Sequence, residues 1–120
     1  MHKIRSGLCD YFPRMVEKTW SFLERTQILG SAASRDSPAL EYESAAMRSR
    51  YFRHVSEGGW PCSSAAHGWP ISDCTAEGLK AVLLLRSHPA IVAGCAHIGD
   101  ERLQLALNVL LTLQNRDGGW

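Results

Sequence analysis

The sequence predicts an all-α protein, built from helices that are separated by loops carrying glycine and tryptophan. Apolar residues recur every three to four positions in three separate segments, which is the period of an amphipathic helix. The tripeptide Gly-Gly-Trp occurs twice, at 58–60 and 118–120. Of the 120 residues, 45% are hydrophobic and 21% are charged, which is a globular composition rather than a disordered one. We therefore expect a helical unit over residues 13–120, preceded by an N-terminal segment over 1–12.

The first helix is expected from Pro13 to about Leu29. Proline suits a first helical turn because its missing N–H would have no partner there, and Gly30 suits the helix end. The apolar positions of this helix are Met15, Val16, Trp20, Leu23 and Ile28.

Two further helices are expected over about 73–86 and 100–114. Ser72 is a suitable N-cap for the former, and Asp100 for the latter. Leucine and valine lie on nearly every side of the third helix, so this helix needs burial between other helices. Three helices cannot pack against one another and also cover every side of the third helix. The pattern therefore favours a larger helical array.

Charge and hydropathy exclude several classes of protein. Thirteen Lys and Arg against twelve Asp and Glu leave a net charge of +1, so no overall field attracts nucleic acid or an anionic membrane. The longest aliphatic run, residues 81–85, is too short to cross a bilayer. Residues 1–13 lack the apolar core of a signal peptide. We expect a chain that begins in the cytosol and binds no nucleic acid.

The four cysteines are scattered through the sequence, at Cys9, Cys62, Cys74 and Cys95. They form no Cys-x-x-Cys pair, and the histidines show no spacing typical of a zinc site. Without a secretory signal, a disulfide framework is disfavoured as well. We expect reduced thiols and no bound metal.

A repeat surrounds the middle of the chain. Phe22-Leu23, three residues and Gln27 are followed by Gly58-Gly59-Trp60, and Leu110, three residues and Gln114 are followed by Gly118-Gly119-Trp120. Repeated helical units of this kind indicate an array whose members pack on their neighbours. Glycine allows the turn, while the indole packs and offers one N–H to a loop. Trp60 and Trp120 are therefore expected to be structural.

Between the two repeats lies the segment Ile71-Ser72-Asp73-Cys74-Thr75-Ala76-Glu77, preceded by Gly58-Gly59-Trp60-Pro61 and Gly68-Trp69. Together with the repeats, these residues resemble the oxidosqualene cyclase family, which includes lanosterol and cycloartenol synthases. The resemblance covers most of residues 13–120 but only a fraction of a complete cyclase. It implies a fragment of an (α/α) double-barrel terpenoid cyclase fold with glutamine–tryptophan repeat loops. The first repeat has a long insertion between Gln27 and Gly58.

The resemblance implies an isomerase that protonates the epoxide of 2,3-oxidosqualene and drives polycyclisation to a sterol or triterpene scaffold, without metal or organic cofactor. Asp73 matches the proton donor, and Cys74 matches the cysteine that hydrogen-bonds this acid. A donor acid must keep its proton near neutral pH, although the ordinary pKa of aspartate is about 3.9. Burial in an apolar cavity raises this pKa, whereas a helix N-terminus lowers it. Burial must therefore dominate.

Four further residues are assigned to the substrate site by the same resemblance: His67, Trp69, Ile71 and Cys62. Ile71 and His67 match residues of cycloartenol-type enzymes. Related squalene cyclases carry a second aspartate at the position of Cys74, so the cysteine favours an epoxide substrate, which is easier to protonate than an alkene. Cys62 departs from the family, which usually has a phenylalanine there to stabilise a cation.

Two alternatives stay open. Beside the interpretation as a fragment of a working cyclase, the first alternative is a truncated, inactive relic, which Cys62 and the ending at Trp120 favour, and the second is a non-catalytic helical repeat module. The isolated 120-residue chain is expected to be inactive and prone to aggregate. By resemblance, a complete enzyme would lie on the endoplasmic reticulum membrane or on lipid droplets, attached through an apolar patch outside this chain.

Overall fold

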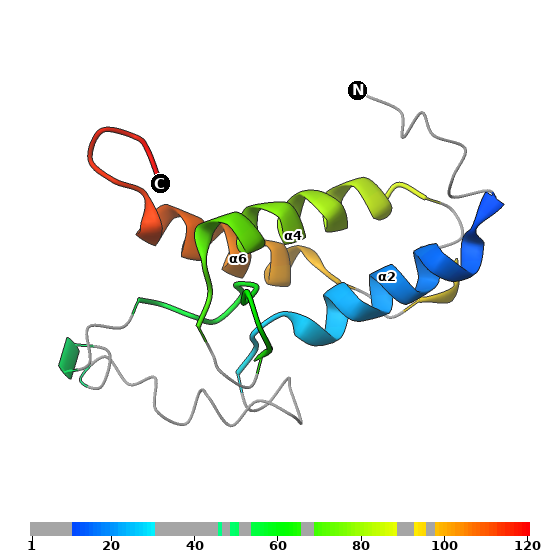
Figure 1. The fold of residues 1–120 in the computed structure, drawn as a ribbon, viewed down its shortest axis with the longest axis horizontal. Coiled ribbons are helices and arrows are strands. Elements are labelled where there is room, and N and C mark those ends of the chain that lie inside the picture. The colour runs from blue at the N-terminus through cyan, green and yellow to red at the C-terminus, as the bar shows by residue number, and fades with distance from the viewer. Residues whose placement is uncertain are drawn as a thin grey trace.

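The structure is a computed structural model that describes residues 11–30, 46, 49–50, 54–65, 69–88, 93–95 and 98–120. It contains three long helices: α2 (Pro13–Thr26), α4 (Ser72–Leu85) and α6 (Asp100–Leu113) (Figure 1). Within the described residues the extended backbone pairs only at one isolated bridge, between Pro61 and Pro70. The predicted all-α class is confirmed. Most of the N-terminal segment and most of the insertion after Gln27 lie outside the described residues.

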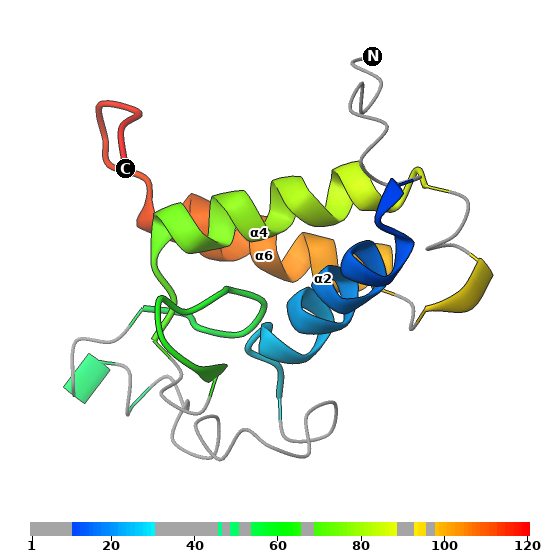
Figure 2. The ribbon, with the colours of Figure 1, turned by 45° about the vertical axis from the view of Figure 1, so that its right-hand side comes forward.

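The helix α4 is central, because it packs against α6 and, less extensively, against α2. Figures 1 and 2 show α4 and α6 running side by side, with α2 beside one half of the pair. The core lies between the three helices and includes one loop tryptophan. Its buried members are Val16, Trp20, Leu23, Trp60, Val82, Ile98, Leu103 and Ala106.

The third helix buries only one of its apolar faces. Leu103, Ala106 and Val109 are buried, whereas Leu107 and Leu111 are exposed. This helix is apolar on nearly every side, and three helices alone cannot cover all of it. One apolar face of α6 is therefore uncovered among the described residues.

The helix ends differ from the sequence-based expectation in two ways. The helix α2 ends at Thr26, about three residues before the expected Leu29, because the backbone of Gln27 is extended (φ −63°, ψ 133°). The helix α4 begins at Ser72 itself, with Ile71 at the N-cap position, so Ser72 is not the cap. Its hydroxyl instead donates to Oδ1 of Asp73 at 3.3 Å. In the same way Asp100 is the first residue of α6 rather than its cap.

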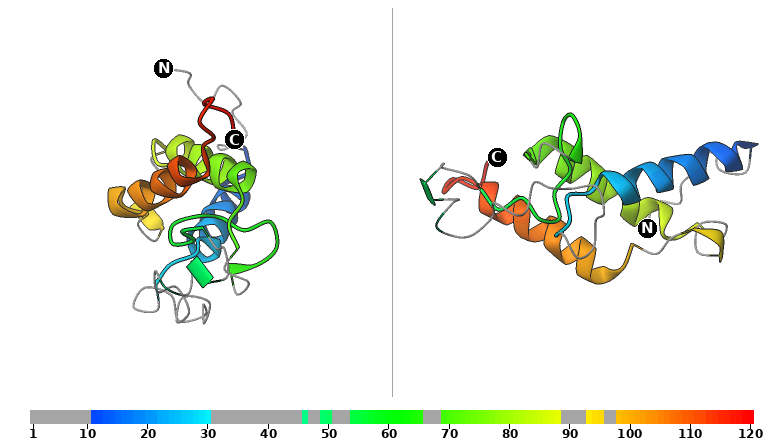
Figure 3. Two further views of the ribbon diagram at one scale, coloured as in Figure 1. Left: turned by 90° about the vertical axis from the view of Figure 1, so that its left-hand side faces the viewer. Right: turned by 90° about the horizontal axis from the view of Figure 1, so that it is seen from below.

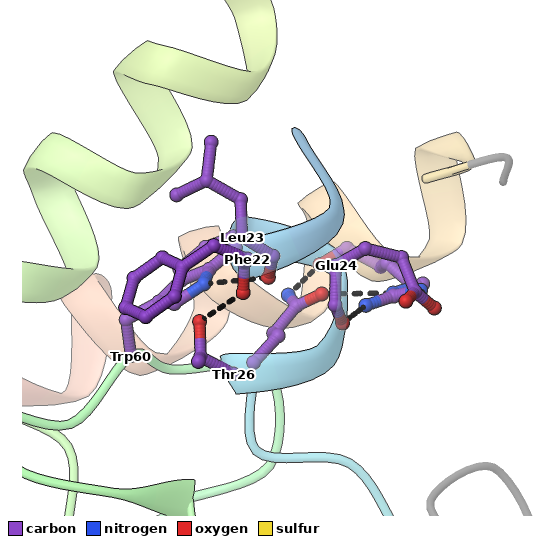
Figure 4. A network of polar contacts seen from close by, with 7 residues as sticks. Phe22, Leu23, Glu24, Thr26 and Trp60 are labelled. Atoms are coloured by element: carbon purple, nitrogen blue, oxygen red, sulfur yellow. Dashed lines mark hydrogen bonds and ion pairs between the residues drawn. The ribbon is translucent and has the colours of Figure 1, made fainter. Parts of the chain in front are cut away.

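Residues 22–27 and 58–60 form what we call the first Gln–Trp unit (Figure 4). Nε2 of Gln27 donates to the carbonyl oxygen of Gly58 at 2.8 Å, and the indole Nε1 of Trp60 donates to that of Leu23 at 3.0 Å. The backbone N–H of Ile28 donates to Gly59 at 2.9 Å. Glutamine and tryptophan thus fasten the loop to the end of α2.

Residues 110–120 form the second Gln–Trp unit, which repeats these hydrogen bonds. Nε2 of Gln114 donates to the carbonyl oxygen of Gly118 at 2.9 Å, and Nε1 of Trp120 donates to that of Leu110 at 2.9 Å. The backbone N–H of Asn115 donates to Gly119 at 2.7 Å. Figures 1 and 3 show this loop extending past the end of α6.

Two glycines allow the first unit to pack closely. Gly58 has a φ of 98°, and a Cβ atom built on it would lie 2.4 Å from the backbone of Leu105 in α6. A Cβ atom built on Gly78 would lie 2.6 Å from the ring of Trp60. The indole therefore approaches α4 where that helix has no side chain.

Candidate active site

The start of α4 carries the predicted acid, Asp73, in its first turn. The side chain is exposed. It borders a hollow of about 250 Å³, whose described lining is mostly apolar and also includes Ser72, Ala76, Leu110 and Trp120. The second Gln–Trp unit thus comes beside the predicted acid. The spacing of the sequence does not reveal this contact, because it depends on how α4 packs against α6.

Cys74, the next residue, is half-buried and packs against the core. Burial raises the pKa of its thiol, and the neighbouring Cys62 thiol and the charge of Asp73 raise this pKa further. The thiol is therefore held in its neutral form, in which it can donate a hydrogen bond.

The loop that carries Cys62 is fastened to the start of α4 by Thr75, which is fully buried. The hydroxyl of Thr75 accepts from the backbone N–H of Trp60 at 3.0 Å and donates to the carbonyl oxygen of Trp60 at 3.3 Å. The N–H of Ile71 also donates to that oxygen, at 3.4 Å. Thr75 belongs to the motif at 71–77, but the sequence pattern alone does not indicate this role.

These contacts bring two of the predicted site residues together. Cys62 and Cys74 line one pocket of about 470 Å³, to which Phe22, Trp60 and Ala81 also contribute. In this pocket the Cys62 thiol is near enough to raise the pKa of the Cys74 thiol. The spacing of these cysteines in the sequence does not indicate that they share a pocket.

Trp69 and Ile71, two further predicted site residues, have different surroundings from those of Asp73. Trp69 is 58% exposed, and Ile71 is half-buried at the N-cap of α4. Neither is among the described residues that line the hollow beside Asp73. His67 lies outside the described residues.

Arg102 is an important polar residue that the sequence analysis missed. Its Nε donates to Oε1 of Gln27 at 2.8 Å, and its guanidinium forms an ion pair with Glu24 at 3.1 Å. Nε2 of Gln27 donates in return to the carbonyl oxygen of Arg102 at 3.0 Å. This residue lies 75 positions after Gln27 in the chain, so no local pattern indicates the contact.

The described part of the chain contains no group of three or more His, Cys, Asp or Glu residues arranged to hold a metal ion. None of its helices has the length and apolar character needed to cross a membrane.

Comparison with known proteins shows that the chain is similar to parts of cycloartenol, lanosterol and alpha-onocerin synthases. It is 55% identical over 117 residues to cycloartenol synthase of Dictyostelium discoideum, and 46% identical over 117 residues to alpha-onocerin synthase LCD of Lycopodium clavatum. Each match covers 98% of this chain and 14% of the relative. Lanosterol synthase of Mus musculus is 51% identical over 72 residues, which is 59% of this chain and 9% of the relative.

No protein-family model matches the chain, and no solved structure matches it. The match to cycloartenol synthase nevertheless extends over 98% of the chain. The chain therefore belongs to the oxidosqualene cyclase family. It spans only 14% of the length of the cycloartenol synthase that it matches.

Proposed function

We propose that this chain is the acid-bearing segment of an oxidosqualene cyclase, within a partial α/α barrel over residues 13–120. Such an enzyme protonates the epoxide of 2,3-oxidosqualene and drives its polycyclisation to a sterol or triterpene scaffold. The observation that carries the proposal is the 55% identity over 117 residues to a cycloartenol synthase, in a segment where Asp73 borders a mostly apolar hollow.

Asp73 is the proposed proton donor. Its O–H transfers a proton to the epoxide oxygen while the adjacent C–O bond breaks, and the electron-poor carbon is then attacked by the nearest alkene of the same substrate. The carboxyl group must stay protonated until that moment, which requires an apolar, water-free surrounding. In this chain Asp73 is exposed. We therefore propose that further walls of a complete barrel cover it.

Cys74 is the proposed partner of the acid. Its raised pKa keeps the thiol neutral, so that the S–H can donate to the carboxylate that forms when Asp73 loses its proton. The N-terminus of α4 also stabilises that carboxylate. Both effects stabilise the carboxylate that remains after the proton has passed to the epoxide.

The proposed substrate contacts are His67, Trp69, Ile71 and Cys62. Trp69 exposes more than half of its surface beside the loop that leads to Asp73, and the ring face of an aromatic residue stabilises a nearby cation. Cys62 offers no ring where relatives of this kind are expected to have one. The loss of one desolvated cation–π contact amounts to about 2 kcal/mol. We expect it to alter the distribution of products.

We further propose that a complete enzyme lies on the endoplasmic reticulum membrane or on lipid droplets through parts outside this chain. The 120-residue chain alone is expected not to cyclise 2,3-oxidosqualene, since Asp73 is exposed in it. Several large apolar side chains are also exposed, which favours aggregation. These are Tyr11, Phe12, Met15, Phe22, Trp69, Leu83, Leu84, Leu107, Leu111 and Trp120.

A chimera tests the proposed function. This chain replaces the matching segment of the Dictyostelium discoideum cycloartenol synthase, and the purified chimera is incubated with 2,3-oxidosqualene. We expect cyclised product from the chimera, and its loss in Asp73→Asn because the amide cannot supply the proton. Glu101→Gln is the matched control, because Glu101 is also an exposed acid at the second position of a helix.

Three outcomes are informative. Product from the chimera and from Glu101→Gln, but not from Asp73→Asn, supports the proposed role of Asp73. Near-normal product from Asp73→Asn removes this residue from the role of the acid. A soluble chimera that makes no product at all favours the inactive relic.

A further inference from the structure

The two thiols of Cys62 and Cys74 are brought together by the fold rather than by the sequence. Both cysteines line the same pocket, where the Cys62 thiol is near enough to raise the pKa of the Cys74 thiol. Thr75 and Ile71 fasten the backbone of Trp60 to the start of α4, so the positions of Cys62 and Cys74 are fixed from both sides. Both cysteines are free thiols in the structure.

We propose that Cys62 and Cys74 form a reversible disulfide, which makes this pair a redox modification site with glutathione disulfide as the oxidant. Because both cysteines line one pocket, the bonding distance of about 2.05 Å between their sulfur atoms requires local movement within that pocket rather than unfolding of the chain. In a reducing compartment such a bond is transient and regulatory rather than a permanent part of the framework.

Exposure sets the order of the two steps. Cys62 is exposed, so its thiolate attacks one sulfur of glutathione disulfide, and one glutathione thiolate leaves. Cys74, deprotonated, then attacks the sulfur of Cys62 and displaces the second glutathione thiolate. The two protons of the cysteine thiols pass to the two glutathione thiolates. Two cysteines lose two electrons in total, and one glutathione disulfide becomes two glutathione molecules.

The environment of Cys74 makes it the second cysteine to react. Its thiol is half-buried, and because its pKa is raised, only a small fraction of Cys74 is in the thiolate form at neutral pH. A mixed disulfide on the neighbouring Cys62 overcomes this disadvantage, because the attack then occurs within one pocket.

The disulfide would remove the S–H of Cys74 from the surroundings of Asp73. This consequence rests on the proposed function, in which that S–H supports the acid. Oxidation is then expected to lower cyclase activity, and reduction to restore it. The formation of the bond itself does not depend on the proposed function.

The experiment uses the full 120-residue chain, recovered as a monomer by gel filtration at low concentration. The chain is incubated with glutathione disulfide, remaining thiols are alkylated, and the linked peptides are identified by mass spectrometry. We expect a loss of alkylation at Cys62 and Cys74 and a peptide pair joined between them. A sample unfolded in urea serves as reference, because its thiols pair without the guidance of the fold.

Cys62→Ser is expected to abolish the linked pair and to leave Cys74 open to alkylation or glutathione. Cys95→Ala is the matched control, since Cys95 is also a half-buried free cysteine and its removal should leave the pair intact. The proposal is overturned if the Cys62–Cys74 link is no more abundant in the folded chain than in urea.

The cyclase chimera separates this proposal from the proposed function. Reversible loss of activity on oxidation, abolished in Cys62→Ser, supports the regulatory consequence. A mapped disulfide with unchanged activity contradicts that consequence but leaves the modification site in place. Full activity of Asp73→Asn contradicts the proposed function, whatever the thiols do.

Discussion

The two Gln–Trp units make the same hydrogen bonds but differ in burial. In each, glutamine donates to the first glycine of Gly-Gly-Trp, and the indole donates to a carbonyl in the last turns of the preceding helix. Trp60 is only 4% exposed, between α2 and α4, whereas Trp120 is 60% exposed. Gln27 is buried and Gln114 is exposed.

The difference shows that the hydrogen bonds of a unit and its burial have separate origins. The hydrogen bonds are local to one helix and one loop, so the second unit forms them in an exposed position. Burial requires a following helix: α6 supplies Arg102 to Gln27, and it supplies the backbone of Leu105 against Gly58. We infer that the first unit contributes to the stability of the chain, and that the second contributes little until another element covers it.

The largest expected difference in stability is between the alanine variants of the two tryptophans. Trp60→Ala should lower the free energy of unfolding by about 3–5 kcal/mol, because it empties a buried site in the core. Trp120→Ala should cost only about 0.5–1.5 kcal/mol, the value of an exposed hydrogen bond. Urea unfolding of both variants measures the difference, and equal losses would contradict the comparison.

Alanine substitution of the two loop glycines should also destabilise the first unit more than the second, with a smaller difference between the variants. Both have positive φ, 98° at Gly58 and 91° at Gly118, so alanine costs about 1–2 kcal/mol at each. At Gly58 the added Cβ would also meet the backbone of Leu105 at 2.4 Å, while at Gly118 nothing lies within 4 Å. Thermal unfolding should therefore show Gly58→Ala as the less stable variant. A larger loss in Gly118→Ala would be incompatible with this packing.

The third comparison concerns Arg102 and Arg86. Arg102→Met removes charged hydrogen bonds to Gln27 and Glu24 in a mostly buried place, at a cost of about 1.5–3 kcal/mol. Arg86→Met is the control, since the ion pair of Arg86 with a largely exposed Asp100 contributes about 0–1 kcal/mol. Unfolding at low and high salt distinguishes the pairs, because screening should weaken the exposed one more. Equal losses in the two variants would refute the special role of Arg102.

The sequence was sufficient to predict the helices but not how they end. Apolar periodicity located α2, α4 and α6, and their bounds at Pro13, Leu85 and Leu113 agree with expectation within one residue. The early end of α2 was missed because Gln27 leaves the helix to bond with Gly58, which lies 31 positions away. A helix-end rule based on Gly30 cannot anticipate a distant partner.

The candidate site shows the same limit. The motif at 71–77 was enough to propose Asp73 and Cys74, because the proposed chemistry resides in neighbouring residues of the sequence. The common pocket of Cys62 and Cys74 depends on Thr75 bonding to Trp60, and the position of Trp120 beside Asp73 depends on the packing of α6 against α4. Such contacts come from tertiary structure, which neither spacing nor composition expresses.

The most direct test of the account is the yield of cyclised product from 2,3-oxidosqualene, compared between the chimera with Asp73 and the chimera with Asp73→Asn. We expect product from the former and none from the latter, with both chimeras folded to the same stability. Equal yields from the two chimeras would contradict the central claim that this chain carries the acid of an oxidosqualene cyclase.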